Sequence, residues 1–364
     1  MKIAIYADRL ESGGGLETHV ITQVNELLRR GHSIFLTANA AASDFLKMVN
    51  GEGRKFRFEL YSNDPLEDLA EFKPDLIHAH PFTAILRGHK VACALNVPLF
   101  ITIHGLYSFG VDRSFNGYSV AKKASKIIAV DDVVEDLLRK SVAFPEKIFT
   151  IYNGINRNEF YPDAADMELV KELKIDCTWK TIVVVSRLED SKEKPVIQLM
   201  DGAPLLAERL NGLNLVIVGD GAYRDMVWAR NRAEIENCHN LRVCRMGRRI
   251  DIPRFLSIAD LVMACSRAAI EAMACKRPVF AMGDGGFAGI INRSKKGVIA
   301  GREGYRWVSN QELLEDLYNT LLDEPQQEKA IQDGYEMIEE YYDIQKVTDK
   351  LESLYQQVLE ASNF

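Results

Sequence analysis

The sequence predicts an α/β protein made of two doubly wound domains in tandem. Short apolar runs alternate with segments of helical composition along most of the chain. Because apolar runs without polar alternation are typical of strands buried on both faces, this pattern favours parallel sheets covered by helices. The pattern breaks once, over the polar stretch 156–180, and then starts again. At 364 residues the chain is also longer than a single hydrophobic core usually supports.

The first domain is predicted at residues 1–160. A glycine-rich turn follows its first strand, and a helix is expected from about Glu17 to Arg30, where Gly31 ends it. The predicted strands are residues 3–6, 33–38, 75–78, 99–102, 126–129 and 147–152.

The second domain is predicted at residues 161–340. Its predicted strands are residues 181–185, 213–218, 241–243, 261–263 and 278–282. Residues 268–275 are rich in helix formers, and Pro278 begins the last strand because proline blocks a helix. From about residue 309 the pattern is helical, and Leu351 and Leu354 have helical spacing in a terminal helix at 341–364.

Composition indicates an ordinary soluble globular protein, with 47% hydrophobic and 27% charged residues. No apolar run is long enough for a transmembrane helix, and the first residues lack the pattern of a signal peptide. We therefore expect a cytoplasmic protein. The net charge of -7 argues against a nucleic-acid partner. The oligomeric state is not determined by the sequence.

Local charge and the cysteines give two further expectations. Basic clusters at residues 29–30, 54–57 and 122–126 could contact the anionic inner face of a membrane, although such clusters are more often simply solvated. The six cysteines show no paired metal spacing and lie mostly in apolar surroundings. We expect them to be buried free thiols.

Candidate site residues are those that directly follow predicted strands, because doubly wound sheets bind ligands at the carboxyl ends of their strands. With two such domains, a cleft between them is the expected location. Gly13, Gly14 and Gly15 follow the first strand and lead into a helix, where free amides and the helix dipole suit an anionic group. A tight turn would need the same residues. No Gly-Lys-Ser/Thr follows, so this is not a P-loop.

Histidines follow two neighbouring strands of the first domain. His104 comes just after the strand 99–102, and this position at the sheet edge favours a functional role. His78 and His80 point to the same side because side chains two apart on a strand share a face. One of these two could be structural.

Cations and glycines take the same positions in the second domain. Arg187 and Lys192 follow its first strand, where a guanidinium and an ammonium could clamp a diphosphate. Gly219 follows the second strand, and Gly285 and Gly286 follow the last. Glycine at such positions lets the backbone approach a bound group.

Glu271 is a single carboxylate on the otherwise apolar helix 268–275. It could simply face solvent on a half-buried helix. With the cations and glycine turns nearby, it could instead bridge the hydroxyls of a ribose.

In their order, these motifs resemble those of the retaining glycosyltransferases of the GT-B fold, specifically family 4 of the sequence classification. The similarity covers almost the whole chain. It rests on Gly13-Gly14 with Glu17, Gly31-His32, 102–105, 151–155, Ser186-Arg187-Leu188 with Lys192, 218–221, 259–261, and 271–275 with Pro278-Val279.

The resemblance implies that the second domain binds a nucleotide sugar, linked to UDP or GDP, and the first binds the acceptor. Arg187 and Lys192 would neutralise the leaving diphosphate, and His104 would contact the transferred sugar; these are the expected catalytic residues. The expected donor-binding residues are Gly13, Gly14, Gly15, Gly219, Arg267, Glu271, Gly285 and Gly286. The expected acceptor-binding residues are Glu17, His80 and Asn153.

The resemblance also implies a hexosyl transfer with retention of configuration by a front-face mechanism. The sequence does not identify the acceptor, and a glycan, a lipid-linked molecule, a small molecule and a protein all stay open. No metal ion or other cofactor is expected, which fits the absence of an Asp-x-Asp motif. The terminal helix is expected to cross back to the first domain.

One departure from the family concerns donor recognition. The family usually has a glutamate eight positions before the one matched by Glu271, and here that position is Met263, with Arg267 as the nearest polar substitute. Gly289 likewise replaces a later glutamate. Two alternatives therefore stay open: another GT-B enzyme such as a nucleotide-sugar 2-epimerase, and a catalytically weakened subunit that binds nucleotide sugar.

Overall fold

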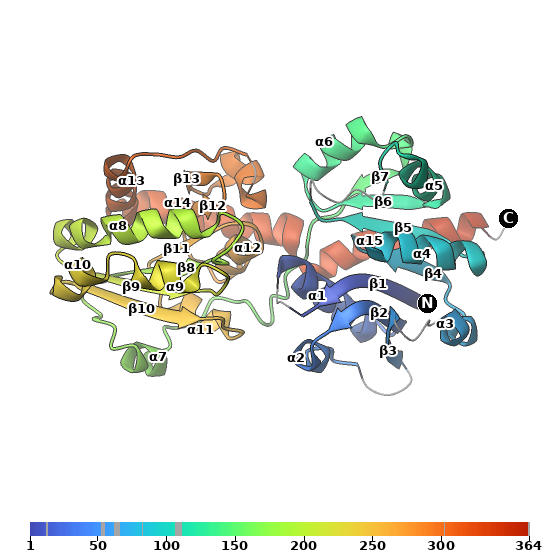
Figure 1. Ribbon diagram of the computed structural model, residues 1–364, viewed down its shortest axis with the longest axis horizontal. Coiled ribbons are helices and arrows are strands. Elements are labelled where there is room, and N and C mark those ends of the chain that lie inside the picture. Colours follow the sequence, from blue (N-terminus) through green and yellow to red (C-terminus); the bar gives the residue numbers. More distant parts are fainter. Residues whose placement is uncertain are drawn as a thin grey trace. The chain divides into compact units, whose positions relative to one another are not determined.

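The computed structural model describes residues 1–11, 14–51, 55–61, 66–81, 83–105, 111–301 and 303–362. The chain divides into two compact units, each built on its own sheet (Figure 1). The first consists of Met1–Gly154 with Tyr341–Phe364, and the second of Ile155–Glu340. The boundary therefore follows Gly154, where the sequence placed it after residue 160, and the end of the chain belongs to the first unit.

The first unit contains a seven-stranded parallel sheet in the order β3-β2-β1-β4-β5-β6-β7. Its strands are β1 (Lys2–Leu10), β2 (Ser33–Ala41), β3 (Phe56–Leu60), β4 (Leu76–Ala79), β5 (Leu99–Ile103), β6 (Lys126–Ala129) and β7 (Ile148–Thr150). The edge strand β3 was not predicted, because its sequence Phe-Arg-Phe-Glu-Leu alternates polar and apolar residues instead of forming an apolar run.

Helices cover both faces of this sheet. They are α1 (Gly15–Arg29), α2 (Ser43–Lys47), α3 (Leu66–Phe72), α4 (Thr83–Ala94), α5 (Phe115–Lys123), α6 (Asp132–Ser141) and α15 (Ile344–Ser362), with the 3-10 helix η3 (Pro145–Lys147). Gly31 closes the first helix, as predicted, and it does so in the left-handed conformation, with a φ of 90°.

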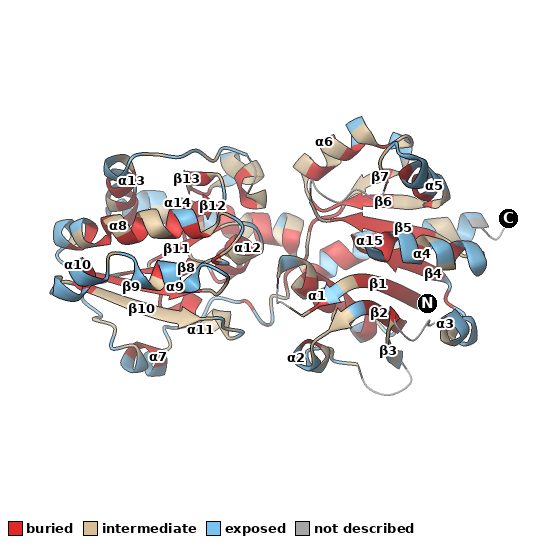
Figure 2. Ribbon diagram, in the orientation of Figure 1, coloured by how far each residue is buried: buried red, intermediate tan, exposed pale blue. Residues whose placement is uncertain are grey.

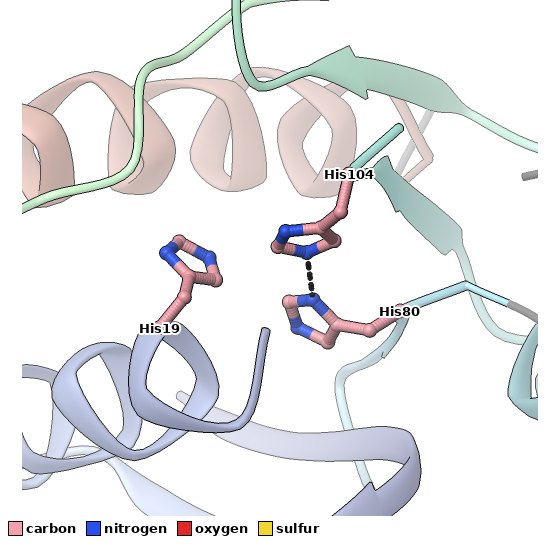
Figure 3. A group of neighbouring side chains, drawn as sticks. All are labelled: His19, His80 and His104. Atoms are coloured by element: carbon pink, nitrogen blue, oxygen red, sulfur yellow. Dashed lines mark hydrogen bonds between the residues drawn. The ribbon is translucent and has the colours of Figure 1, made fainter. Parts of the chain in front are cut away.

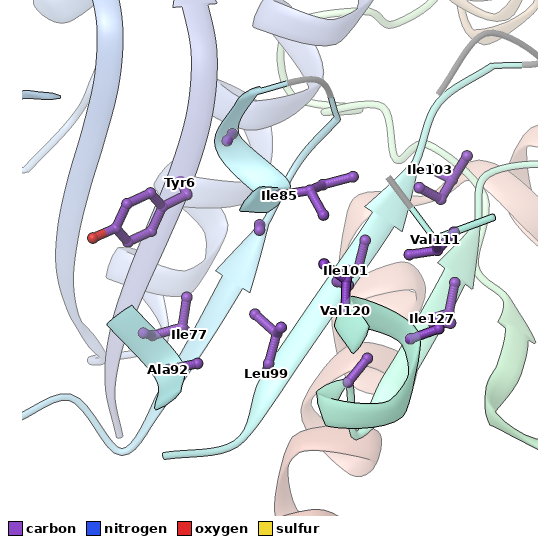
Figure 4. Packing of buried hydrophobic residues seen from close by; sticks show 14 of the residues in the cluster. Tyr6, Ile77, Ile85, Ala92, Leu99, Ile101, Ile103, Val111, Val120 and Ile127 are labelled. Atoms are coloured by element: carbon purple, nitrogen blue, oxygen red, sulfur yellow. The ribbon is translucent and has the colours of Figure 1, made fainter. Parts of the chain in front are cut away.

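Alternate strand residues separate two cores in this unit. Ile5 and Phe100 share one core with α1 and α15, whereas Tyr6 and Ile101 share the other with α3, α4, α5 and α6. Figure 4 shows this second core, in which strand side chains interdigitate with those of α4 and α5. Each fully buried aliphatic side chain contributes roughly 1.5–3 kcal/mol, so the terminal helix α15 is an integral part of the first unit.

The second unit contains a six-stranded sheet in the order β10-β9-β8-β11-β12-β13. Its strands are β8 (Lys180–Val185), β9 (Leu213–Val218), β10 (Leu241–Gly247), β11 (Leu261–Ala264), β12 (Val279–Gly283) and β13 (Gly286–Ile290). The last strand is antiparallel to β12, with Gly283 paired to Gly286. The sequence predicted only a glycine turn there, so the placement of Gly286 in a turn is wrong.

The helices of the second unit are α7 (Met167–Glu172), α8 (Glu193–Leu210), α9 (Arg224–Ala229), α10 (Arg232–Asn237), α11 (Ile252–Ser257), α12 (Ser266–Ala274), α13 (Asn310–Leu322) and α14 (Glu324–Met337). The 3-10 helix η4 (Arg293–Ala300) lies between β13 and α13, and the π-helix η5 (Ile338–Tyr342) leads into α15. The helices α8 and α13 pack on one face of the sheet, where Leu199 and Leu317 share a core with Ile182.

Each sheet has one topological switch point, where consecutive strands leave in opposite directions. It lies between β1 and β4 in the first unit and between β8 and β11 in the second. Ligands of doubly wound sheets bind in the crevice at the carboxyl ends of these strands. The two switch points are therefore the places to look for a site.

The six cysteines are free thiols, as expected, but most of them are not buried as predicted. Among the cysteines only Cys275 is buried, and Cys93 and Cys177 are exposed. Figure 2 shows that central strands such as β1 and β5 are largely buried, whereas the helices around them are partly exposed.

Members of two of the three basic clusters form ion pairs within the protein. Arg30 forms an ion pair with Glu352 of α15, and Arg57 pairs with Asp68. Arg54 lies outside the described residues. Contact with a membrane surface stays a prediction. No described helix is both long enough and apolar enough to cross a bilayer.

Candidate functional site

The switch point of the second unit brings the loop after β8 close to the end of β11. Arg187 and Lys192 follow β8, and Cys265 follows β11. Burial raises the pKa of the Cys265 thiol, and the charges of Lys192 and Arg187 lower it. Both cations therefore lie within electrostatic reach of Cys265, as expected for residues that share one crevice.

Arg187 is half-exposed and loosely held by neighbouring carboxylates. Its Nη1 lies 3.2 Å from Oε1 of Glu189 and 3.7 Å from Oδ2 of Asp190. Exposed ion pairs of this kind contribute about 0–1 kcal/mol, so a bound anion could replace them at little cost. Lys192 is the N-cap residue of α8, where the helix dipole also favours an anion.

The backbone of this loop is strained. Asp190 and Ser191 have φ values of 56° and 71°, and left-handed conformations at two successive non-glycine residues cost roughly 1–3 kcal/mol each. Such strain is typical of segments that position functional groups. The strained turn directs the chain into α8 and sets the position of Lys192.

Gly219 serves the packing between this loop and the end of β9. A Cβ at Gly219 would lie 1.8 Å from the carbonyl oxygen of Ser186. The amide of Gly219 donates to the carbonyl of Gly247 over 2.9 Å. Because its N–H is already used, Gly219 can assist a ligand only by letting two backbone segments approach. Its donor-binding role stays a prediction.

Glu271 and Arg267 lie one turn apart on α12, and Nε of Arg267 donates to Oε1 of Glu271 over 3.0 Å. Glu271 is 8% exposed, so it does not face solvent. Burial raises the pKa of its carboxyl from 4.5 to about 7, Arg267 opposes this increase, and the nearby Glu159 adds to it. A buried carboxylate with one cation still has acceptor capacity for hydroxyl groups.

Gly285 and Gly286 pack against Tyr305 and Arg306. A Cβ at Gly285 would lie 2.9 Å from Cβ of Tyr305, and one at Gly286 would lie 2.4 Å from the carbonyl oxygen of Arg306. Gly286 also has a φ of 103°, which side chains rarely adopt. The two glycines are thus required by the fold itself, whatever they contribute to a donor.

The glycine turn of the first unit ends where α1 begins. Gly14 is the N-cap residue and provides no side-chain cap, and Gly15 is the first helical residue. A Cβ at Gly14 would lie 2.6 Å from Oε2 of Glu17, so this carboxylate folds back toward the helix N-terminus. Its negative charge fits a hydroxyl-bearing ligand better than an anion at this position. Gly13 lies outside the described residues.

His78 is the structural member of the pair on β4. Its Nε2 is 2.6 Å from Oγ1 of Thr102. Its Nδ1 is hydrogen-bonded to the hydroxyl of Tyr355 on α15. The same Nδ1 also lies 3.3 Å from Nε2 of Gln23. Burial is the main reason why the pKa of His78 lies well below 6.5. Both ring nitrogens are satisfied, so His78 joins the terminal helix to the sheet.

His80 and His104 form a second pair at the carboxyl edge of β4 and β5. Nδ1 of His80 lies 3.0 Å from Nε2 of His104. Burial lowers the pKa of His80 to about 3, so its imidazole is neutral at physiological pH. The sequence predicted these two residues but not the third histidine beside them. His19 on α1 has its ring centroid 4.9 Å from that of His104.

Asn153 and Glu193 each have a buried side-chain oxygen without a hydrogen-bond partner among the described residues. Asn153 lies in the loop after β7, and its buried Oδ1 has no hydrogen-bond partner among the described residues, which leaves it able to accept from a ligand. Sequence reasoning missed Glu193, which follows Lys192 and is 4% exposed. Its Oε2 also lacks a hydrogen-bond partner in the described part of the chain. The adjacent cation was the only signal that could have indicated Glu193.

Comparison with known proteins identifies the class and then the family. A model described as Glycosyltransferase Family 4 matches residues 13–159, and one described as Glycosyl transferases group 1 matches residues 179–317. Two Rossmann-like sheets in tandem, with a glycosyltransferase domain on each, define a protein of the GT-B class. The two matches together extend over more than half of the sequence. The chain belongs to the group 1 glycosyltransferases, and the predicted family and fold are confirmed.

Individual relatives are distant. The chain is 26% identical over 254 residues to the D-inositol 3-phosphate glycosyltransferase of Jonesia denitrificans, a match that covers 62% of this chain and 59% of that protein. The chain thus matches only about three fifths of the length of the curated relatives.

Solved structures share the fold over nearly the whole chain. The Anabaena protein HepE in complex with UDP-glucose has a TM-score of 0.72 and 21% identity, covering 97% of this chain and 100% of that one. A putative UDP-N-acetylglucosamine 2-epimerase from Listeria monocytogenes has a TM-score of 0.66 and 14% identity, covering 99% and 96%. At these identities the likeness concerns the fold alone, and the fold does not separate transferase from epimerase.

Proposed function

We propose that the chain transfers a hexosyl group from a UDP- or GDP-linked sugar to an acceptor, with retention of the anomeric configuration. The observation that carries the proposal is the pair of cations, Arg187 and Lys192, which follow β8 at the switch point of the second sheet. Two cations beside a helix N-terminus suit a diphosphate. Membership of the group 1 glycosyltransferases supports the same reaction.

The donor would be held by its nucleotide diphosphate. Arg187 would exchange its contacts with Glu189 and Asp190 for phosphate oxygens, and Lys192 would add a point charge. Glu271 would accept hydrogen bonds from the ribose hydroxyls. Because the two cations neutralise the diphosphate, we propose that this step needs no metal ion. The UDP-glucose bound by HepE is a donor of the proposed class.

The chemistry then requires little more from the protein than positioning and charge. The bond between the anomeric carbon and the phosphate oxygen breaks first, which gives the sugar oxocarbenium character. Arg187 and Lys192 stabilise the negative charge that develops on the departing phosphate. The acceptor oxygen forms its bond to the anomeric carbon on the face that the phosphate leaves, and its proton passes to the phosphate.

The first unit would bind the acceptor and contact the transferred sugar. His104 would contact the sugar, and His80, Glu17 and Asn153 would bind acceptor hydroxyls. The neutral His80 imidazole and the Glu17 carboxylate suit hydroxyl groups, which are common to a glycan, a lipid-linked molecule and a small polyol.

The experiment that tests the proposal is an assay of nucleotide release. The purified chain is incubated with a panel of UDP- and GDP-sugars, with and without crude lipid and glycan acceptors, and released UDP or GDP is measured. We expect release that depends on an acceptor and a glycosylated product with unchanged anomeric configuration. If no nucleotide binds even by calorimetry, the enzymatic proposal fails.

The same assay separates the two alternatives. An epimerase would release nucleotide or convert the sugar without any acceptor. A weakened binding subunit would bind nucleotide sugar by calorimetry but release nothing. The second alternative is favoured by one observation: Met263 occupies the position of a family glutamate, and it is 0% exposed in β11 and cannot contact a polar donor.

A further inference from the structure

Three histidines gather at the carboxyl edge of the first sheet. His19 comes from α1, His80 follows β4 and His104 follows β5. One ring nitrogen from each can be chosen so that all three lie within 4.8 Å of one another. Figure 3 shows His19 approaching the other two rings from the helix side. The topology, not the sequence, brings them together, because 61 and 24 residues separate them along the chain.

The contact between His80 and His104 already has a spacing that fits two ligands of one ion. Nδ1 of His80 and Nε2 of His104 are 3.0 Å apart. Two nitrogens bound to one tetrahedral Zn²⁺ at about 2.0–2.1 Å lie roughly 3.3 Å apart. His19 completes the set, because one nitrogen from each of the three rings can be chosen so that all lie within 4.8 Å of one another.

The ring of His80 is buried and only one of its two nitrogens has a partner among the described residues. It is 0% exposed, and its Nε2 has no hydrogen-bond partner among the described residues. Leaving a buried polar nitrogen unsatisfied costs about 1–3 kcal/mol. If Nδ1 coordinates a cation, the proton sits on Nε2 and the ring stays neutral, but Nε2 still has no partner among the described residues, so it is the grouping of the three rings that points to an ion. As far as the structure describes the chain, the cluster thus has the donor atoms for a cation and includes no carboxylate that would favour Mg²⁺ or Ca²⁺.

The donor set determines the class of ion. Imidazole nitrogens suit Zn²⁺, Co²⁺, Ni²⁺ and Cu²⁺, and three histidines with a fourth open position are a known zinc arrangement. We propose that His19, His80 and His104 bind one divalent transition-metal ion, with Zn²⁺ as the representative, and that the bound ion inhibits transfer.

Inhibition follows from the position of His104 and rests on the proposed function. His104 already lies against His80, and a bound ion would occupy one of its ring nitrogens, so that nitrogen could no longer contact the transferred sugar. The expectation that the protein needs no metal came from the resemblance to the family, and the missing Asp-x-Asp motif that fits it concerns the diphosphate. The histidine site lies in the other unit, so an inhibitory ion there is compatible with a reaction that needs none.

Direct binding is tested first on the full chain, without any assay of activity. The protein is stripped with a chelator and titrated with Zn²⁺ by calorimetry and with Co²⁺ by absorption spectroscopy. We expect one equivalent of either ion and Co²⁺ ligand-field bands of a tetrahedral site, with no sulfur-to-cobalt charge-transfer band. Failure of the wild-type chain to bind Co²⁺ or Zn²⁺ overturns the proposal, even if the transferase activity is fully established.

Variants then locate the ion. His19→Asn and His80→Asn should each weaken Zn²⁺ binding at least tenfold. The matched control is His89→Asn on α4, where Nε2 of His89 lies 3.7 Å from Sγ of Cys93 and could bind zinc adventitiously. Loss of binding in the control but not in His19→Asn would assign the ion to the His89–Cys93 pair and refute the proposal.

One measurement keeps the test valid if the buried His80→Asn variant does not fold. Zinc X-ray absorption of the wild-type protein should give a first shell of nitrogen and oxygen only, whereas a sulfur neighbour would overturn the proposal. The inhibitory part is tested separately by adding Zn²⁺ to the nucleotide-release assay. We expect reversible inhibition that a chelator relieves. Tight binding of Zn²⁺ without inhibition would support the metal site but refute its proposed effect on transfer.

Discussion

Arg267 donates a hydrogen bond from its Nε to Oε1 of Glu271, one turn further along α12, over 3.0 Å. The two side chains are only 12% and 11% exposed. Burial nevertheless outweighs the cation, because the pKa of Glu271 rises to about 7 instead of falling. The carboxyl that we assign to the ribose therefore changes its charge near physiological pH.

Replacing Glu271 by glutamine should remove a pH dependence of stability. The folded carboxyl keeps its proton up to about pH 7, whereas the ordinary pKa of a glutamate is 4.5. The folded state therefore binds more protons between these values, and the wild type loses stability as the pH rises through them. The full difference corresponds to about 3 kcal/mol at most. Urea unfolding at pH 5 to 8 measures the free energy of unfolding of both proteins. As the pH rises, the value for Glu271→Gln should increase relative to that for the wild type.

A matched control uses an exposed glutamate of the same unit. Glu236 pairs with Arg232 on the surface, and Glu236→Gln should follow the wild-type pH profile. Parallel curves for Glu271→Gln and the wild type would contradict the raised pKa.

The same carboxyl should govern nucleotide binding. Glu271→Ala should weaken UDP or GDP binding about tenfold to a hundredfold at pH 8, because hydrogen bonds to a charged acceptor contribute about 1.5–3 kcal/mol. Wild-type affinity should increase as the pH passes 7 and the carboxylate ionises. Calorimetry at pH 6 and 8 measures both effects. Equal affinities of wild type and variant at pH 8 would exclude the ribose role.

Loss of either cation at the second switch point should stop turnover. Arg187→Ala and Lys192→Ala should each lower kcat by about 10²–10³-fold, as expected when a group that stabilises transition-state charge is removed. Arg232→Ala is the control, because Arg232 is an exposed arginine paired on the surface with Glu236. Steady-state rates of nucleotide release measure the effect, and circular dichroism checks the fold. Near-normal rates in both variants would refute the diphosphate assignment.

The sequence predicted the position of the site better than its internal contacts. Strand ends follow from local periodicity, so the sequence alone places Arg187, Lys192, His80 and His104 at sheet edges. The pairing of Arg267 with Glu271 also has a local signal, because residues four apart on a helix face each other. The burial of these two side chains has no local sequence signal, because it depends on which elements cover α12.

Long-range topology explains what sequence reasoning missed. His19 lies in the recognised glycine motif, but only the order of β1, β4 and β5 in the sheet brings it to the other two histidines. The antiparallel strand β13 was not predicted, because its pairing with β12 is supported by a bridge from Phe287 to Arg306, which lies further along the chain. Glycines at both ends of a turn indicate that backbone segments approach closely there. They do not indicate whether a strand follows the turn.

Two glycines near Arg187 should respond very differently to alanine. At Gly219 a Cβ would lie 1.8 Å from the carbonyl oxygen of Ser186, so Gly219→Ala should cost about 3 kcal/mol or more. At Gly247 a Cβ would meet nothing within 4 Å, and the φ of 64° should cost only about 1 kcal/mol. Urea unfolding compares the two variants. Equal losses would mean that the loop after β8 moves freely away from β9.

The hydroxyl of Tyr355 should stabilise the first unit through His78. Tyr355→Phe removes one hydrogen bond between α15 and β4, and we expect a loss of about 1 kcal/mol in the free energy of unfolding. The loss stays moderate because Nδ1 of His78 still lies 3.3 Å from Nε2 of Gln23. Tyr161→Phe is the control, because Tyr161 is 49% exposed and its hydroxyl can bond to water. Hydrogen exchange adds a local measurement, since amides of α15 should exchange faster in Tyr355→Phe. Unchanged exchange in α15 would show that apolar packing alone holds the terminal helix on the sheet.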